Sequence, residues 1–179
     1  MKNWLLSSGL FFITLLSAAQ TGQDFPVLTG ELLTGESFTL PNNQEDYQAY
    51  FIGMAYSKKA ELDLETWFQP TFDKFILKKG LFDGTYRVQP LFVPMFIGFN
   101  RAAEKSVSKR LAEQTPKEFL QNILVYRGTL EPYQSALKLN DKTKPYLFLI
   151  SPTGKILYTS SGPFTEKKME KIADILDTL

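Results

Sequence analysis

The chain has 179 residues, a formal net charge of +1 at neutral pH, no cysteine and no histidine. Without thiols it can form no disulfide and perform no thiol–disulfide exchange, and without imidazole it lacks the usual general base near pH 7 and the commonest metal ligand. A near-neutral charge argues against nucleic acid as a partner, because a basic face supplies most of the affinity for phosphate backbones. We therefore predict no metal site and no cofactor.

The first 19 residues are predicted to be a secretory signal peptide. Lys2 gives the positive start, an apolar stretch runs from Trp4 to Leu16, and Ser17-Ala18-Ala19 fits a signal-peptidase site before Gln20. The apolar stretch is about 13 residues, short of the roughly 18 that cross a bilayer, so no stable membrane span is expected after cleavage. Residues 20–179 are then one domain, periplasmic or secreted.

Short strands are predicted at the start of this domain. Phe25–Leu28 and Ser37–Leu40 are β-prone runs around Gly30 and Gly35, which indicates an N-terminal hairpin. Residues 50–56 are almost all apolar. A strand that is apolar on both faces is typical of a central strand with helices on both sides.

A helix is predicted from Lys58 to Lys79, with Ser57 as its N-cap. Pro70 should kink or split it, and Gly80 should end it. Its apolar side chains fall on one face at helical spacing: Leu64, Phe68, Phe72, Phe75 and Ile76. Glu61, Asp63 and Glu65 could bind a cation, but acidic residues near a helix N-terminus are favourable by themselves.

In the second half of the chain, the pattern predicts a strand at residues 86–92 that is irregular at Pro90 and Pro94. It then predicts three helices: one over residues 101–111, one that begins at Thr115, and one over residues 131–139. Residues 145–151 and 156–160 predict a hairpin around the turn 152–155. Thr165 caps the last helix, whose buried stripe is Met169, Ile172, Ala173, Leu176 and Leu179.

The resulting order is hairpin, β, α, β, α, α, ββ, α. Alternating β and α units predict an α/β fold of three layers: a central mixed sheet with helices on both faces, an N-terminal β-hairpin and an antiparallel edge.

Two stretches resemble redoxins of the bacterial cell envelope, members of the thioredoxin superfamily that serve in thiol reduction and cytochrome maturation. They are Phe25-Pro26-x-Leu28-x-Gly30 with the later Phe38–Pro41, and Lys144–Ile156, which is similar to the redoxin cis-proline, apolar strand and Gly-Lys-Ile turn. The resemblance implies a thioredoxin-like fold. In redoxins the first central strand leads into Cys-x-x-Cys, whereas here Ser57-Lys58-Lys59-Ala60 stands in that place.

The chain also resembles, more weakly, the thioredoxin-like assembly factors of the mitochondrial ATP synthase, which likewise lack the dithiol. The shared features are Phe25-Pro26 with Gly30, Trp67 with Pro70, Tyr133 with Leu137, and Tyr146–Leu149. This second resemblance implies only that such a fold can hold a partner without performing chemistry.

Six residues are candidate binding residues: Tyr56, Ser57, Lys58, Trp67, Lys144 and Pro145. The superfamily uses the residue before its cis-proline to bind an extended peptide, so Lys144, Pro145 and Tyr56 would border a groove. Pro145 could instead simply open an edge strand. Trp67 is either a core residue or a recognition residue.

No residue is assigned as catalytic. The leading hypothesis is an exported, non-catalytic binding or assembly module without redox cysteines, whose partner is an extended peptide or an envelope protein. One alternative is an enzyme that uses Ser57 with a lysine base, which needs a lysine of lowered pKa. The other is a purely structural secreted domain.

Overall fold

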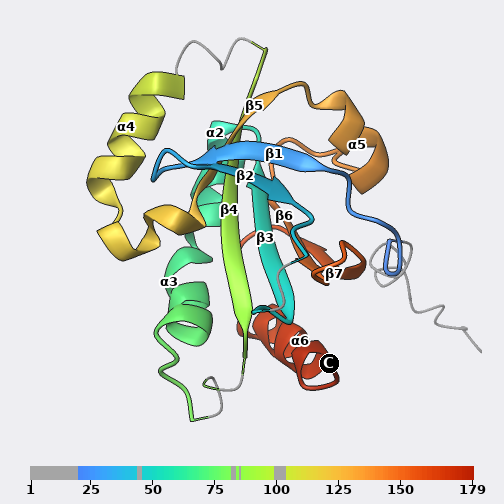
Figure 1. The fold of residues 1–179 in the computed structure, drawn as a ribbon. Coiled ribbons are helices and arrows are strands. Elements are labelled where there is room, and N and C mark those ends of the chain that lie inside the picture. Colours follow the sequence, from blue (N-terminus) through green and yellow to red (C-terminus); the bar gives the residue numbers. More distant parts are fainter. Residues whose placement is uncertain (1–19, 44–45, 82–83, 85, 99–103) are drawn as a thin grey trace, which may run out of the picture.

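The computed structural model describes residues 20–43, 46–81, 84, 86–98 and 104–179, so the predicted signal peptide lies outside the described residues. A seven-stranded sheet in the order β2-β1-β5-β4-β3-β6-β7 organises the described chain (Figure 1). The strands are β1 (Leu28–Leu32), β2 (Ser37–Leu40), β3 (Ala49–Ala55), β4 (Val88–Ile97), β5 (Leu124–Gly128), β6 (Tyr146–Ile150) and β7 (Ile156–Ser161).

The sheet is mixed. The neighbours β3, β4 and β5 run parallel, whereas the β1–β2 and β6–β7 hairpins pair antiparallel within themselves and with the parallel strands beside them. The predicted fold class, with its N-terminal hairpin and antiparallel closing hairpin, is therefore confirmed.

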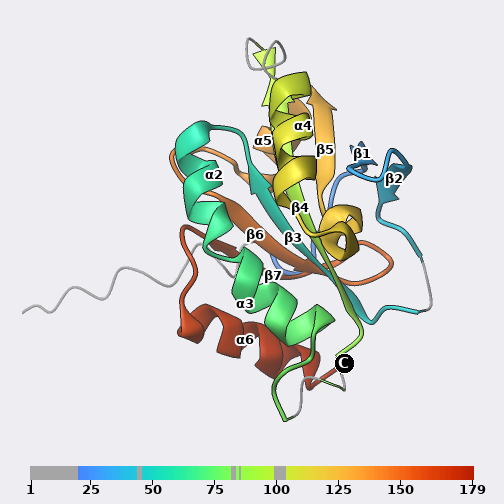
Figure 2. The ribbon, with the colours of Figure 1, turned by 90° about the vertical axis from the view of Figure 1, so that its left-hand side faces the viewer.

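All seven residues of β3 are buried, so the strand needs cover on both faces. Tyr50, Ile52 and Met54 pack into one cluster with residues of α5 (Glu131–Leu137), and Phe51 packs into a second cluster on the opposite face. That second cluster is covered by α2 (Lys58–Glu65), α3 (Phe68–Thr71), the π-helical turn Phe72–Ile76 and α6 (Glu166–Leu176). Figure 2 looks onto this side of the sheet, with α4 (Glu104–Gln114) beside α2.

The predicted helix over residues 58–79 is divided earlier than expected. It breaks at Thr66 and Trp67, before Pro70, and helical structure ends at Ile76. Pro70 falls in the first turn of α3, where a backbone N–H has no intrahelical partner, so the proline is accommodated after the break.

Prolines also fail to end β4, which continues to Ile97 through Pro90 and Pro94. The strand pairs with β3 from Val88 to Pro94 and with β5 from Met95 onward. Each proline removes one donor only, and the residues between them maintain the ladder.

Two other boundaries differ from the prediction. The first hairpin strand begins at Leu28, while Phe25 is buried before it, with its ring 5.6 Å from that of Phe148. The helix predicted from Thr115 is a single 3₁₀ helix, Lys117–Asn122, because the chain must then extend into β5.

The prediction missed β5 altogether. The run Leu124-Val125-Tyr126 is short, and its β-prone residues are followed at once by Arg127 and Gly128. The strand forms through its neighbours, since it pairs with β1 on one side and β4 on the other. It provides the third parallel strand of the sheet.

Trp67 is a core residue. Its side chain is completely buried, its Nε1–H donates to the Gly162 carbonyl at 3.1 Å, and its ring packs against Phe51 and Phe164 with centroids 5.4 and 5.3 Å away. The indole therefore joins α2 and α3 to the segment that leads into α6.

We expect Trp67→Ala to lower the free energy of unfolding by about 3–5 kcal/mol, because it opens a cavity and leaves the Gly162 carbonyl without its donor. Urea unfolding followed by circular dichroism measures the change. The control Leu62→Ala, at a position of α2 that is 58% exposed, should alter stability by no more than about 0.5 kcal/mol. Equal losses in the two variants would contradict the role assigned to Trp67.

Candidate functional site

A broad hollow lies where β3, β4 and β5 end. Its volume is about 1080 Å³. Residues at the carboxyl ends of the three parallel strands, residues of α5 and residues of the loop before β6 line the hollow. They are Tyr56, Ser57, Ile97, Gly98, Gly128, Thr129, Leu130, Glu131, Gln134, Asn140, Asp141, Lys142 and Thr143. In open α/β sheets, ligands bind outside the carboxyl ends of parallel strands, which makes this hollow the candidate site.

Ser57 links α2 to the loop before β6. Its backbone is extended and its Oγ accepts a hydrogen bond from the Ala60 N–H at 3.2 Å, which is the predicted N-cap. The same hydroxyl donates to the carbonyl of Lys142, 85 residues further on. Both partners are backbone groups, and neither is a base that could activate the hydroxyl.

Two tyrosines hold the same loop. The Tyr56 hydroxyl donates to the Leu139 carbonyl at 2.8 Å, and the Asp141 N–H donates to the Tyr146 hydroxyl at 2.6 Å. The two rings lie 15° from parallel with centroids 6.4 Å apart. Burial, reinforced by Tyr146, raises the pKa of Tyr56 to about 12, so this phenol remains a protonated donor at neutral pH.

Asp141 organises the turn inside the loop. Its carboxylate accepts from the Thr143 hydroxyl at 2.6 Å and from the Thr143 N–H at 2.9 Å, and the Lys144 ammonium lies 3.2 Å away. Hydrogen bonds from Thr143, then from Lys144, lower the pKa of Asp141 to about 2. The loop that forms this wall of the hollow is therefore held by its own Asp141 contacts as well as by Ser57 and the two tyrosines.

The structure brings only two of the six candidate residues to the hollow. Tyr56 and Ser57 line it, whereas Lys58 is the exposed first residue of α2. Lys144 is also exposed, pairs with Asp141 and is not among the lining residues. Trp67 lies in the core, where its side chain is not available to a ligand.

Pro145 does not have the geometry that the resemblance implied. The described residues contain one cis peptide bond, Leu40–Pro41, so Pro145 does not follow a cis bond. Pro145 is buried, and its carbonyl accepts from the Gly162 N–H at 3.0 Å. The loop of residues 140–143, rather than the Lys144–Pro145 peptide, forms this wall of the hollow.

Sequence reasoning missed the part of the lining that follows β5 because it missed that strand. Gly128, Thr129 and Leu130 follow that strand directly, and Glu131 and Gln134 belong to α5 beyond it. The β-prone run Leu124–Tyr126 was the signal that could have revealed them.

Within the part of the chain that the structure describes, no group of three or more acidic residues is arranged to hold a metal ion. The same residues include no helix whose length and apolar character would let it cross a membrane.

No protein-family model matches the sequence, and no curated protein matches it. Solved structures do match. The C-terminal domain of a protein named as a thiol-disulfide oxidoreductase from Bacteroides thetaiotaomicron is 16% identical, with a TM-score of 0.57 over 90% of this chain and 99% of that one.

Two further similar structures come from other bacteria. The exposed lipoprotein thioredoxin of Streptococcus pneumoniae is 15% identical, with a TM-score of 0.52 over 86% of this chain and 100% of that one. A protein named as the thiol:disulfide interchange protein DsbE of Chlorobium tepidum is 16% identical, with a TM-score of 0.52 over 87% and 97%.

The fold is thus thioredoxin-like, of the kind found in thiol-disulfide oxidoreductase domains, as the sequence resemblance implied. The chain carries this fold without any cysteine, so it lacks the dithiol centre and cannot perform dithiol–disulfide exchange.

We expect two substitutions at Ser57 to separate its two hydrogen bonds. Ser57→Ala loses both and should cost about 0.5–2 kcal/mol through the cap alone. Ser57→Asp keeps a capping acceptor, but a carboxylate cannot donate to the Lys142 carbonyl. Hydrogen exchange should therefore speed up in residues 139–144 of both variants and in α2 of Ser57→Ala only. Wild-type protection of the loop in Ser57→Asp would contradict the link.

The pH dependence of the same loop is also predicted. Because the pKa of Asp141 is about 2 in the folded chain and about 3.9 when unfolded, its contribution to stability is present above pH 4 and is lost as pH falls toward 2. The protection factors of the loop amides, which are corrected for the intrinsic pH dependence of exchange, should fall over that range in the wild type and change less in Asp141→Asn. The matched control is Asp174→Asn on α6, which should keep the wild-type profile.

Proposed function

We propose that this protein is an exported, non-catalytic thioredoxin-like module that binds an extended segment of a cell-envelope protein in the hollow at the ends of β3, β4 and β5. The observation that carries the proposal is the difference between the Ser57 hydroxyl, which both donates and accepts a hydrogen bond, and the hollow next to it. Ser57 stands where the resemblance places the redox centre, and its hydroxyl is hydrogen-bonded to two backbone groups, while the described residues leave the hollow beside it open.

The hollow suits backbone recognition. It contains the ends of three strands, where backbone groups leave the sheet ladder, together with hydroxyl and amide side chains from Thr129, Gln134 and Thr143. An extended peptide presents alternating N–H and C=O groups that such a lining can satisfy. Lys144 and Pro145 stay outside this contact, and the walls are the loop 140–143 and the start of α5.

The alternative enzyme, with Ser57 as nucleophile, finds little support in the geometry. A serine nucleophile needs a base within hydrogen-bond reach, and both partners of the Ser57 hydroxyl are backbone groups. Lys144, one of the lysines considered for that role, is paired with Asp141. A purely structural domain is less favoured because, among the residues that the structure describes, side chains do not fill the space beside Ser57.

Export is supported by the sequence and is consistent with the comparison. The first 19 residues have the pattern of a signal peptide, and one structure with the same fold is named an exposed lipoprotein thioredoxin. A chain without cysteine also has no thiol to oxidise in an oxidising compartment.

Photo-crosslinking tests the binding role. A benzophenone amino acid at Gln134, an exposed α5 residue of the hollow, should give discrete crosslinked bands when the purified protein is irradiated with an envelope fraction. The same group at Lys171, exposed on α6, is the matched control and should give none. Competition by unlabelled wild-type protein should remove the Gln134 bands. Identical bands from both positions, or none from Gln134, would overturn the proposal.

The same purified protein should show no turnover. It should not accelerate insulin reduction by dithiothreitol, and a fluorophosphonate serine probe should leave Ser57 unlabelled. Labelling that disappears in Ser57→Ala would replace the binding module with the serine enzyme.

A further inference from the structure

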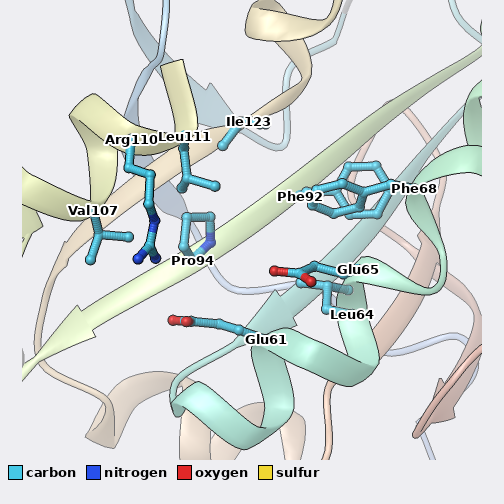
Figure 3. A pocket seen from close by; sticks show the side chains of 10 residues that line it. All are labelled: Glu61, Leu64, Glu65, Phe68, Phe92, Pro94, Val107, Arg110, Leu111 and Ile123. Carbon is cyan, nitrogen blue, oxygen red and sulfur yellow. The ribbon is translucent and has the colours of Figure 1, made fainter. Parts of the chain in front are cut away.

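A second, smaller cavity lies between α2 and α4, and its lining shares no residue with the hollow (Figure 3). Its volume is about 50 Å³. The lining combines seven apolar side chains with three charged ones: Leu64, Phe68, Phe92, Pro94, Val107, Leu111 and Ile123, and then Glu61, Glu65 and Arg110.

The apolar side chains come from both sides of the cavity. Leu64 and Phe92 are buried in the sheet-facing core, whereas Val107 and Leu111 are half-buried residues of α4 that face them. A space of about 50 Å³ exceeds the roughly 10–15 Å³ that one water needs by a factor of about three to five, which is room for a branched aliphatic group of a few carbons.

The charged side chains carry both signs. Glu61 and Glu65 lie one turn apart on α2, and Arg110 faces them from α4 across the cavity (Figure 3). No ion pair within 4.0 Å joins Arg110 to either carboxylate in the described chain. Burial, and then Glu65, raises the pKa of Glu61, while Arg110 and Lys58 oppose that rise. A ligand cation beside the two carboxylates would relieve their repulsion.

The helix that carries Arg110 is weakly packed. No residue of α4 is buried, and near its first turn Glu104 is held by Arg127 at 2.8 Å. A molecule that filled the cavity would contact both α2 and α4 and would fasten α4 to the rest of the fold.

We propose that this cavity binds a free aliphatic α-amino acid such as leucine, with its side chain among the apolar residues, its ammonium beside Glu61 and Glu65, and its carboxylate toward Arg110. A free amino acid is the occupant because it carries both charges and the alkyl group on one carbon. An alkylamine, a fatty acid or either end of a peptide would satisfy only one sign of charge. This site is separate from the peptide-binding role proposed for the hollow.

Titration of the full domain with L-leucine, followed by NMR of the α2 and α4 amides, tests the proposal. We expect saturable changes in the chemical shifts of these amides, together with slower hydrogen exchange in α4. Two analogues each remove one charge: N-acetyl-leucine lacks the ammonium and leucinamide lacks the carboxylate. Because each exposed ion pair contributes about 0.2–1 kcal/mol, each analogue should bind about 1.4- to fivefold more weakly. Absence of saturation, or equal affinity for all three compounds, would overturn the proposal.

Matched variants test which protein side chain contacts each charged group of the ligand. Glu61→Gln should reduce leucine affinity while leaving N-acetyl-leucine unchanged, and Arg110→Gln should reduce leucine affinity while leaving leucinamide unchanged. Val107→Trp should fill the cavity and abolish binding. The control Glu113→Gln, on the same helix and paired with Lys109, should bind leucine as the wild type does. Because the analogues are compared within each folded variant, a loss through misfolding would lower all three affinities together and would be recognised.

Discussion

The complete burial of β3 is the constraint on which the rest of the structure depends. Seven consecutive buried residues, with parallel β4 on one side and antiparallel β6 on the other, cannot be accommodated unless both faces of the sheet are covered. The aromatic layer around Phe51 and Trp67 provides one cover, and α5 with the N-terminal segment provides the other. The end of β3 then fixes where Tyr56 and Ser57 emerge, so the candidate site follows from the core.

At the start of α2, the described contacts of Ser57 tie elements of the fold together. A thioredoxin-like enzyme needs a reactive sulfur at the start of the helix after the central strand, with access to a substrate. Here a serine caps the helix and ties it to the loop before β6, with Tyr56 and Tyr146 reinforcing that loop. These contacts fix the wall of the hollow, and they are the physical basis of the proposed binding role.

The two cavities differ in the kind of ligand that they favour. The hollow is wide and lies where parallel strands release backbone groups, which suits a chain segment. The α2–α4 cavity is small and mostly apolar with both charges at its rim, which suits a small molecule. Two elements connect them. Ser57, which lines the hollow, caps α2, and α2 carries Glu61, Leu64 and Glu65 of the smaller cavity; β4 carries Phe92 and Pro94 of the smaller cavity and Ile97 of the hollow.

The sequence by itself determined the elements with strong local patterns: the apolar run of β3, the Ser57 cap, the closing hairpin, and Met169, Ile172 and Leu176 of the α6 stripe. The predicted stripe was wrong at Leu179, which lies beyond α6 and is 61% exposed. The sequence also determined the absence of thiol and imidazole chemistry. Tertiary structure alone decided that β5 forms between β1 and β4, that Pro145 is buried, and that residues 140–143 wall the hollow. The reason is sequence separation: the Ser57–Lys142 bond spans 85 residues and the Trp67–Gly162 bond spans 95, and periodicity within a short window carries no information about such contacts.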